Sequence, residues 1–266
     1  MVQRLVVILF VMMVLVGLVR ADDVKEVITE NAEGLKGIKA KKITWKKDGA
    51  KMVLVKPDVP AQYEEKKTFD RLGNPMTKKV KVSDASPAFW MDATAVTVGQ
   101  FKKFLKSTDY KFDGELWGKV YQYSPTDKHP VIQVTWHDAV AYAKWARKRL
   151  PTEKEWKFAA KGSLVGKEYS WGDDVSVASD YAHYDSWNDG KGTTKPVGSF
   201  KPNGYGLFDM SGNVWEWCEE SGVLWGGSWF NGPYYLRMAR RRNFLPTSSF
   251  NSRLGFRCVS GLPAAQ

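Results

Sequence analysis

From residue 162 onward the sequence is rich in Gly, Asn, Asp, Ser and aromatic residues, and it lacks the periodic apolar pattern of long helices. Gly, Asn, Asp and Ser are the residues that turns and loops favour. Trp, Tyr and Phe make up 14% of the chain, which supplies ample apolar surface for a core between loops. The C-terminal part therefore predicts loops and short strands, with no further long helices.

The part of the chain before residue 162 predicts helices and strands. Three threonines each precede a helix-like segment and are followed three positions later by Gln, Asp or Glu, the pattern of a capping box. These threonines are Thr97, Thr135 and Thr152. Apolar runs at residues 51–55 and 88–91 predict strands, and the lysine-rich residues between them predict a long loop or an edge hairpin over 57–86. The fold class that follows is α+β.

The N-terminus has the pattern of a signal peptide over residues 1–21. Arg4 precedes an apolar run from Leu5 to Val19, and the small residue Ala21 offers a cleavage site. The run is shorter than the roughly 20 residues that a transmembrane helix needs, so we expect cleavage, with no transmembrane anchor afterwards; a retained anchor is the alternative. The mature protein is then expected to be secreted, periplasmic or at the cell surface.

The remaining sequence is expected to form one domain with an extension. Residues 22–50 are charged and low in large apolar residues, which indicates a linker or a loosely attached extension. A single compact domain is predicted over residues 51–262.

The protein has two cysteines, Cys218 and Cys258. In an exported protein an even number of cysteines predicts a disulfide. Metal binding by the two thiolates is the weaker alternative, because neither cysteine has a Cys or His nearby in the sequence.

The net charge is +11 and comes mostly from lysine, concentrated at residues 36–51 and 66–81. Such runs usually form a solvated surface, and an exported protein is poorly placed to meet nucleic acid. We therefore expect no nucleic-acid partner; a functional interpretation of the charge would point to anionic glycans or lipid headgroups.

A series of motifs carries a family resemblance. They occupy, in order, residues 89–101, 130–136, 149–156, 169–172, 203–217, 225–236 and 254–258. This series resembles the formylglycine-generating enzyme family, also called sulfatase-modifying factors. The resemblance implies a C-type-lectin-like fold that is low in regular secondary structure, in agreement with the loop-rich composition.

The resemblance also shows what this protein lacks. In the enzymes, two cysteines five positions apart after a Gly-Gly-Ser sequence bind copper(I) and activate oxygen, which converts a sulfatase cysteine to formylglycine. Those positions are Asn231 and Leu236 here. Copper(I) selects thiolates, whereas an amide is a hard neutral ligand and an alkyl side chain is no ligand. The sequence therefore argues against copper and against formylglycine generation.

A calcium site is implied by the resemblance. The side chains of Asp209 and Glu216 and the backbone carbonyls of Gly212 and Val214 match a calcium site of the family. Two carboxylates with carbonyls between them suit a hard cation. The alternative is a loop held by ordinary hydrogen bonds, in which Glu216 pairs with an arginine.

The segment after residue 225 predicts a ligand-binding surface. Ser228 and Trp215 match positions that line the family's substrate groove, although core packing is the alternative for Trp215. The predicted ligand-binding residues are Trp215, Ser228, Trp229, Phe230, Asn231, Tyr234, Tyr235, Arg242, Asn243 and Phe244. Arginines at 237, 240–242, 253 and 257 offer a cationic rim suited to carboxylates or sulfates, with Arg257 expected to be buried and paired.

The sequence thus favours a binding module over an enzyme. The same fold occurs in variable proteins of diversity-generating retroelements, which are diversified after a Gly-Gly-Ser-Trp sequence, and the residues after Trp229 are compatible with that mutagenesis. We expect an exported domain that binds a protein or glycan at this surface, with a retroelement-diversified binder as one form. The alternative is a divergent oxidase that works without the cysteine pair through a carboxylate such as Glu219 or Glu220. Sulfatase activation ranks third.

Overall fold

The structure is a computed structural model of the protein. It describes residues 27–35, 38–56, 62–69, 75–83, 88–185, 192–242 and 245–261. The predicted signal peptide lies outside these ranges. Within them, no helix has both the length and the apolar character needed to span a bilayer.

The first sheet joins the two ends of the described sequence. Its order is β1-β2-β3-β6-β11, and the neighbouring strands are antiparallel except for the parallel pair β1 and β2. The strands are β1 (Ile28–Thr29), β2 (Lys42–Trp45), β3 (Lys51–Val55), β6 (Phe89–Asp92) and β11 (Val259–Ser260). The strands predicted at 51–55 and 88–91 are therefore confirmed, the second shifted by one residue.

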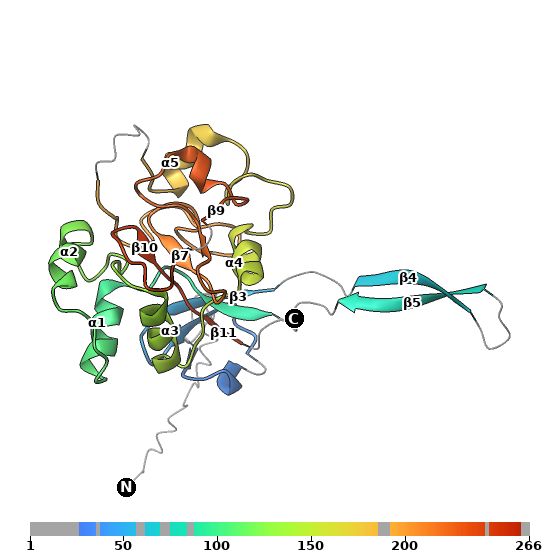
Figure 1. The fold of residues 1–266 in the computed structure, drawn as a ribbon, viewed down its shortest axis with the longest axis horizontal. Coiled ribbons are helices and arrows are strands. Elements are labelled where there is room, and N and C mark those ends of the chain that lie inside the picture. The colour runs from blue at the N-terminus through green and yellow to red at the C-terminus, as the bar shows by residue number, and fades with distance from the viewer. Residues whose placement is uncertain are drawn as a thin grey trace, which may run out of the picture.

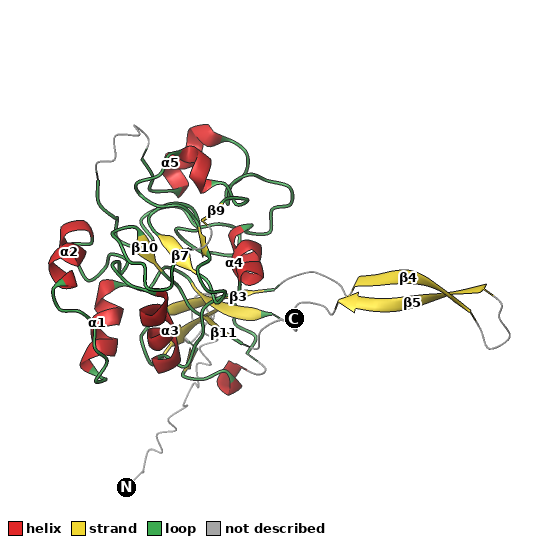
Figure 2. Ribbon diagram, in the orientation of Figure 1, coloured by secondary structure: helices red, strands yellow, loops and turns green. Residues whose placement is uncertain are grey.

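The second sheet is built from very short strands in the order β10-β7-β8-β9. They are β7 (Trp215–Trp217), β8 (Leu224–Trp225), β9 (Arg241–Arg242) and β10 (Leu254–Gly255). Figure 2 shows that loops make up most of the structure around this sheet. The loop-rich C-terminal part that the composition predicts is thus confirmed.

Of the five α-helices in the described residues, three begin where the sequence predicts. The α-helices are α1 (Val98–Lys106), α2 (Leu116–Tyr123), α3 (Trp136–Trp145), α4 (Glu153–Ala160) and α5 (Ala178–Tyr181). Three short 3-10 helices also occur in the described ranges: η1 (Glu33–Leu35), η2 (Val175–Val177) and η3 (Pro233–Leu236). The caps Thr97, Thr135 and Thr152 all form capping boxes, their hydroxyls accepting backbone N–H groups at 3.1–3.2 Å. We did not predict α2, whose cap Glu115 makes no side-chain cap bond.

A long hairpin extends away from the body of the molecule (Figure 1). Its strands β4 (Gln62–Phe69) and β5 (Pro75–Ser83) pair antiparallel. Of the two forms expected for residues 57–86, a loop or a hairpin, the structure has the hairpin.

The compact part of the protein begins before residue 51, the predicted domain boundary. Ile43 and Trp45 of β2 are buried in the core, with 2% and 0% exposure, and the indole Nε1 of Trp45 donates to the carbonyl of Ala146 at 2.7 Å. The last part of the expected linker is therefore an integral sheet strand. Its surrounding lysines concealed it, because only alternate residues of β2 are buried.

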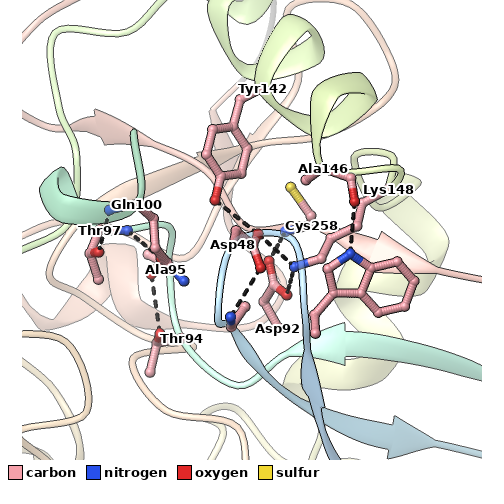
Figure 3. Close-up of polar contacts among 12 residues, drawn as sticks. Asp48, Asp92, Thr94, Ala95, Thr97, Gln100, Tyr142, Ala146, Lys148 and Cys258 are labelled. Carbon is pink, nitrogen blue, oxygen red and sulfur yellow. Dashed lines mark hydrogen bonds and ion pairs between the residues drawn. The ribbon is translucent and has the colours of Figure 1, made fainter. Parts of the chain in front are cut away.

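A buried ionic cluster explains how this strand is held (Figure 3). The ammonium of Lys148 lies 2.9 Å from Asp48 Oδ2 and 2.7 Å from Asp92 Oδ1, and all three side chains are almost completely buried. Tyr142 donates its hydroxyl to Asp48, and the backbone N–H of Cys258 donates to Asp92. We call this group the Lys148 cluster; it joins the β2–β3 turn, β6, the segment after α3 and the segment before β11.

The Lys148 cluster holds two carboxylates and one ammonium. Burial raises the pKa of Asp92 to about 6, although Lys148 partly offsets this effect. Burial also disfavours the Lys148 cation, but Asp92 and Asp48 outweigh it, so the pKa of Lys148 lies above its ordinary value. The ammonium is therefore what allows two acidic groups to be buried together.

The predicted disulfide does not form. Cys218 and Cys258 are both free and buried, and they belong to different apolar clusters of the core. Burial raises the pKa of both thiols well above the ordinary value. Both cysteines therefore act as small apolar core residues.

Replacing Lys148 with alanine should strongly destabilise the domain. The substitution leaves two carboxylates buried without a cation, which costs about 3–5 kcal/mol near neutral pH. Because the folded-state pKa of Asp92 lies above its unfolded value, the loss should shrink as the pH falls and this carboxyl becomes protonated. Urea unfolding near neutral and mildly acidic pH measures both effects.

The control is Lys201→Ala, which removes an exposed ion pair with Asp180 and should leave the unfolding midpoint nearly unchanged. An equal loss for Lys148→Ala at both pH values would show that packing of the lysine stem, not its charge, is what matters.

Thiol titration should find two free cysteines per molecule. With no reductant, a thiol reagent such as 5,5′-dithiobis(2-nitrobenzoate) should react slowly with the folded protein, because both thiols are buried with raised pKa values. Under denaturant both should react at once. If the denatured, unreduced protein contains no free thiol, the prediction of a disulfide between Cys218 and Cys258 is correct after all.

Candidate functional site

The predicted binding segment begins with a tight turn after β8. Gly227 has a φ of 79°, and a Cβ built on it would lie 3.0 Å from the carbonyl oxygen of Tyr235. Only glycine suits such a backbone at so close an approach. The turn brings Ser228 back against the loop that it opens, so the segment folds on itself.

Asn231 lies at the centre of this loop. Its Oδ1 accepts hydrogen bonds from Trp215 Nε1 at 2.8 Å and from Ser228 Oγ at 2.7 Å. Among the described residues its Nδ2 group has no partner. The side chain thus occupies one of the family's cysteine positions as a fixed polar group, with two donors on its oxygen and its amide hydrogens free.

A pocket of about 430 Å³ opens beside Asn231. Its lining residues are Trp215, Phe230, Asn231, Gly232, Tyr235, Arg242 and Arg253. Five of these belong to the predicted ligand-binding set. We call this cavity the Asn231 pocket; it combines aromatic walls, one amide and two guanidinium groups.

Three further residues of the predicted set, Ser228, Trp229 and Tyr234, are described and do not line the pocket. Ser228 and Trp229 are buried beneath it, with 0% and 4% exposure; Trp229 donates to the carbonyl of Ser252 and stacks on Tyr123. Tyr234 is exposed beside the pocket. The predicted residues Asn243 and Phe244 lie outside the described residues.

Two predictions about single residues turned out differently. Trp215 is only 2% exposed yet lines the pocket, so core packing and site lining, which we weighed as alternatives, both apply. Arg253, which we placed only in the wider cationic rim, lines the pocket directly, its guanidinium 4.5 Å from the ring centre of Phe230. Its place could not be derived from the motif series, because it lies between motifs.

The second cysteine position of the family has become part of the core. Leu236, at the end of η3, is 1% exposed and packs in a cluster with Tyr169 and Ala182. With Asn231 at the other position, no catalytic cysteine pair is present in the sequence.

The residues predicted to bind calcium are partly engaged elsewhere. Glu216 is 1% exposed, and its two carboxylate oxygens accept from Arg257 Nε and Nη2 at 2.7 and 2.8 Å. Trp156 Nε1 also donates to Glu216, at 2.7 Å. Arg257 is thus buried and paired as expected, and this carboxylate already has a cation.

Of the two predicted carboxylate ligands, Asp209 has an oxygen without a hydrogen-bond partner among the described residues. Its Oδ2 accepts the backbone N–H of Gly198 at 2.8 Å, whereas its buried Oδ1 has no hydrogen-bond partner. Burial raises the pKa of Asp209 to about 6. No cluster of three or more His, Cys, Asp or Glu side chains in the described ranges has the arrangement of a metal site. The predicted set holds only two carboxylates, one of them paired with Arg257, and calcium binding stays a prediction.

Comparison with known proteins gives the family. The model of the sulfatase-modifying factor enzyme 1-like domain matches residues 41–262, and the chain belongs to this family. The match begins one residue before β2, in agreement with the corrected domain boundary.

The relatives of this protein include proteins named as formylglycine-generating enzymes and proteins named as inactive. The formylglycine-generating enzyme of Streptomyces coelicolor is 32% identical over 245 residues, covering 65% of this chain and 78% of the relative. The inactive C-alpha-formylglycine-generating enzyme 2 of Bos taurus is 40% identical over 152 residues, covering 50% of each.

Solved structures confirm the predicted fold. PvdO from Pseudomonas aeruginosa has a TM-score of 0.61 at 25% identity, covering 81% of this chain and 96% of its own. Treponema denticola variable protein 1 has a TM-score of 0.58 at 23% identity, covering 83% and 99%. The protein thus has the α+β, C-type-lectin-like fold of the formylglycine-generating proteins.

Replacing Asp209 with asparagine should stabilise the protein near neutral pH, by up to about 3 kcal/mol. The folded-state pKa of about 6 lies above the unfolded value, so the cost of the buried carboxylate is absent below about pH 4 and complete above about pH 6. Asn also tolerates the φ of 55° at this position. Urea unfolding across this pH range checks the difference.

Calcium binding by Asp209 would contradict this prediction. If Asp209 binds a cation, CaCl₂ should raise the melting temperature of the unmodified protein relative to EDTA, and Asp209→Asn should abolish that rise. We expect the two melting temperatures to agree.

Proposed function

We propose that this protein is an exported ligand-binding domain on the sulfatase-modifying factor scaffold, without formylglycine-generating chemistry. The observation that carries the proposal is Asn231: a thiolate position of the family holds an amide fixed by Trp215 and Ser228 at the edge of an open pocket. A site that had merely lost its cysteines would have no need of this ordered polar arrangement. The ligand class is a protein or a glycan.

The surface around the Asn231 pocket has the composition of a recognition site. Phe230, Tyr234 and Tyr235 are 38%, 45% and 45% exposed although they are large aromatic residues. Arg240 lies over the ring of Tyr234, 3.8 Å from its centre. Rigid aromatic side chains with arginine and small polar residues provide contact area at a low entropic cost.

The relative named as inactive supports the absence of chemistry. The bovine protein, which its name calls inactive, is 40% identical to this protein over 152 residues, half of each chain. The family therefore includes at least one member whose name records no activity, and its likeness to this protein is compatible with a binding role.

The oxidase alternative has no support from the pocket. It relied on Glu219 or Glu220, and neither lines the Asn231 pocket. Glu220 instead accepts the backbone N–H of Glu153 at 2.7 Å, at the first turn of α4. This carboxylate serves a helix terminus.

Retroelement diversification is a narrower form of the same proposal. It requires a near-identical genomic copy of the segment encoding residues 225–256 that differs only at adenines and lies beside a reverse-transcriptase gene. Without such a copy, the domain has a fixed binding surface, and the broader proposal stands.

A ligand screen tests the proposed function. Peptide and glycan arrays should yield a ligand whose affinity falls at least about tenfold in Tyr235→Ala, because a pocket-lining aromatic side chain is a typical binding hot spot. The matched control is Tyr121→Ala, which removes an exposed tyrosine from α2 and should keep full affinity.

Formylglycine-generating activity would contradict the proposed function. Incubation with copper(I), oxygen and a cysteine-containing sulfatase peptide should give no formylglycine product by mass spectrometry. A product that depends on Asn231 or Tyr235 would make the domain an enzyme.

A further inference from the structure

Two arginines share the Asn231 pocket with no acidic residue between them. Arg242 comes from β9 and Arg253 from the residue before β10, and both are half-buried. Neither makes an ion pair in the described part of the protein, and no carboxylate lines the cavity. Among the described residues, the pocket therefore holds two positive charges and no compensating negative charge.

The two charges oppose each other. The pKa of Arg253 is lowered, first because the group is partly buried and second because Arg242 is near. Arg253 is held in place by its contact with the ring of Phe230. Because neither arginine has an acidic partner among the described residues, an anion that enters the pocket would relieve this repulsion.

The other lining groups suit a single anionic group attached to an apolar body. The Nδ2 of Asn231 supplies two donors, since its Oδ1 already accepts from Trp215 and Ser228. The rings of Trp215, Phe230 and Tyr235 form the walls. A volume of about 430 Å³ is at the small end of ligand pockets, so it accommodates one amino-acid side chain and its neighbouring groups.

The neighbouring arginines are not part of this charge pair. Arg237 pairs with Glu168 at 3.2 Å, and Arg240 lies over Tyr234. A sulfated glycan carries repeated charges and is bound by extended arrays of basic groups. Two enclosed guanidinium groups match one planar carboxylate better, because each can donate to it in a bidentate manner.

We propose that the Asn231 pocket binds a carboxylate of a peptide ligand, held between Arg242 and Arg253, with the adjoining apolar part of the ligand against the aromatic walls. The proposal rests on the proposed function and specifies its ligand class. The carboxylate can come from the C-terminus of the peptide or from an acidic side chain, and the test separates these two sources.

The test uses small probes and the complete domain. N-acetylphenylalanine presents a terminal carboxylate, N-acetylglutamic acid α-amide presents a side-chain carboxylate, and N-acetylphenylalanine amide is the neutral control. Binding is followed through the indole N–H resonance of Trp215 in ¹H–¹⁵N NMR spectra. At least one acid should bind at least about tenfold more tightly than the amide, and the stronger acid identifies the source.

Charge-removing variants assign the effect to the two arginines. Arg242→Gln and Arg253→Gln should each reduce the preference for the acid over the amide at least about fivefold. Arg147→Gln is the control: it removes an exposed arginine that follows α3 and does not line the pocket, and it should keep the preference. The comparison of acid with amide in the unmodified protein needs no variant, so it remains decisive if a variant fails to fold.

Equal binding of acid and amide, or no binding of either, overturns the carboxylate assignment. A sulfated disaccharide that binds more tightly than both acids also overturns it, in favour of a sulfated glycan. If an array ligand is lost in Tyr235→Ala but unaffected by both glutamine variants, only this inference fails. If the array ligand is unaffected by Tyr235→Ala, the proposed function fails, whatever the probes show.

Discussion

The buried pair of Arg257 and Glu216 is the interaction on which the arrangement of this domain depends. The guanidinium takes both oxygens of Glu216 in β7 and also donates to the carbonyls of Asp92, Ala93 and Phe208. It therefore connects the second sheet with the end of β6 in the first sheet and with the loop that precedes Asp209. In a domain with such short strands, backbone ladders alone cannot fix the loops, and buried charge-assisted hydrogen bonds provide the missing constraints.

Side-chain hydrogen bonds and packing also explain how the loop around Asn231 is ordered without the cysteines of the family's enzymes. Asn231 keeps three groups in register, since its carbonyl oxygen accepts from Trp215 and Ser228 and its own backbone N–H donates to Ser228. Leu236 fills the other former ligand position with an apolar contact. The loop is therefore held by hydrogen bonding at Asn231 and by packing at Leu236, the two positions that the family resemblance assigns to cysteines.

Local patterns were enough to predict part of this structure. The capping boxes at Thr97, Thr135 and Thr152 involve atoms three residues apart, so the sequence contained all the information needed. The β2 strand was missed because the partners of Trp45 and Asp48 lie about one hundred residues further on, at Ala146 and Lys148. The motif series located most of the pocket, and the sequence left open whether Glu216 binds a cation or pairs with an arginine; the structure has the pair with Arg257. The series could not reveal that Arg253 enters the cavity from outside the motifs.

The hairpin of β4 and β5 begins and ends at one point of the first sheet. Val55, the last residue of β3, is paired directly with Phe89, the first residue of β6, so the backbone leaves and re-enters the sheet at facing positions. The register of β3 against β6 is set by their own pairing and does not require the extension. The hairpin is thus an insertion in a simple strand connection, a place where members of such a family can gain, lose or lengthen a projecting arm without rebuilding the core or the Asn231 pocket.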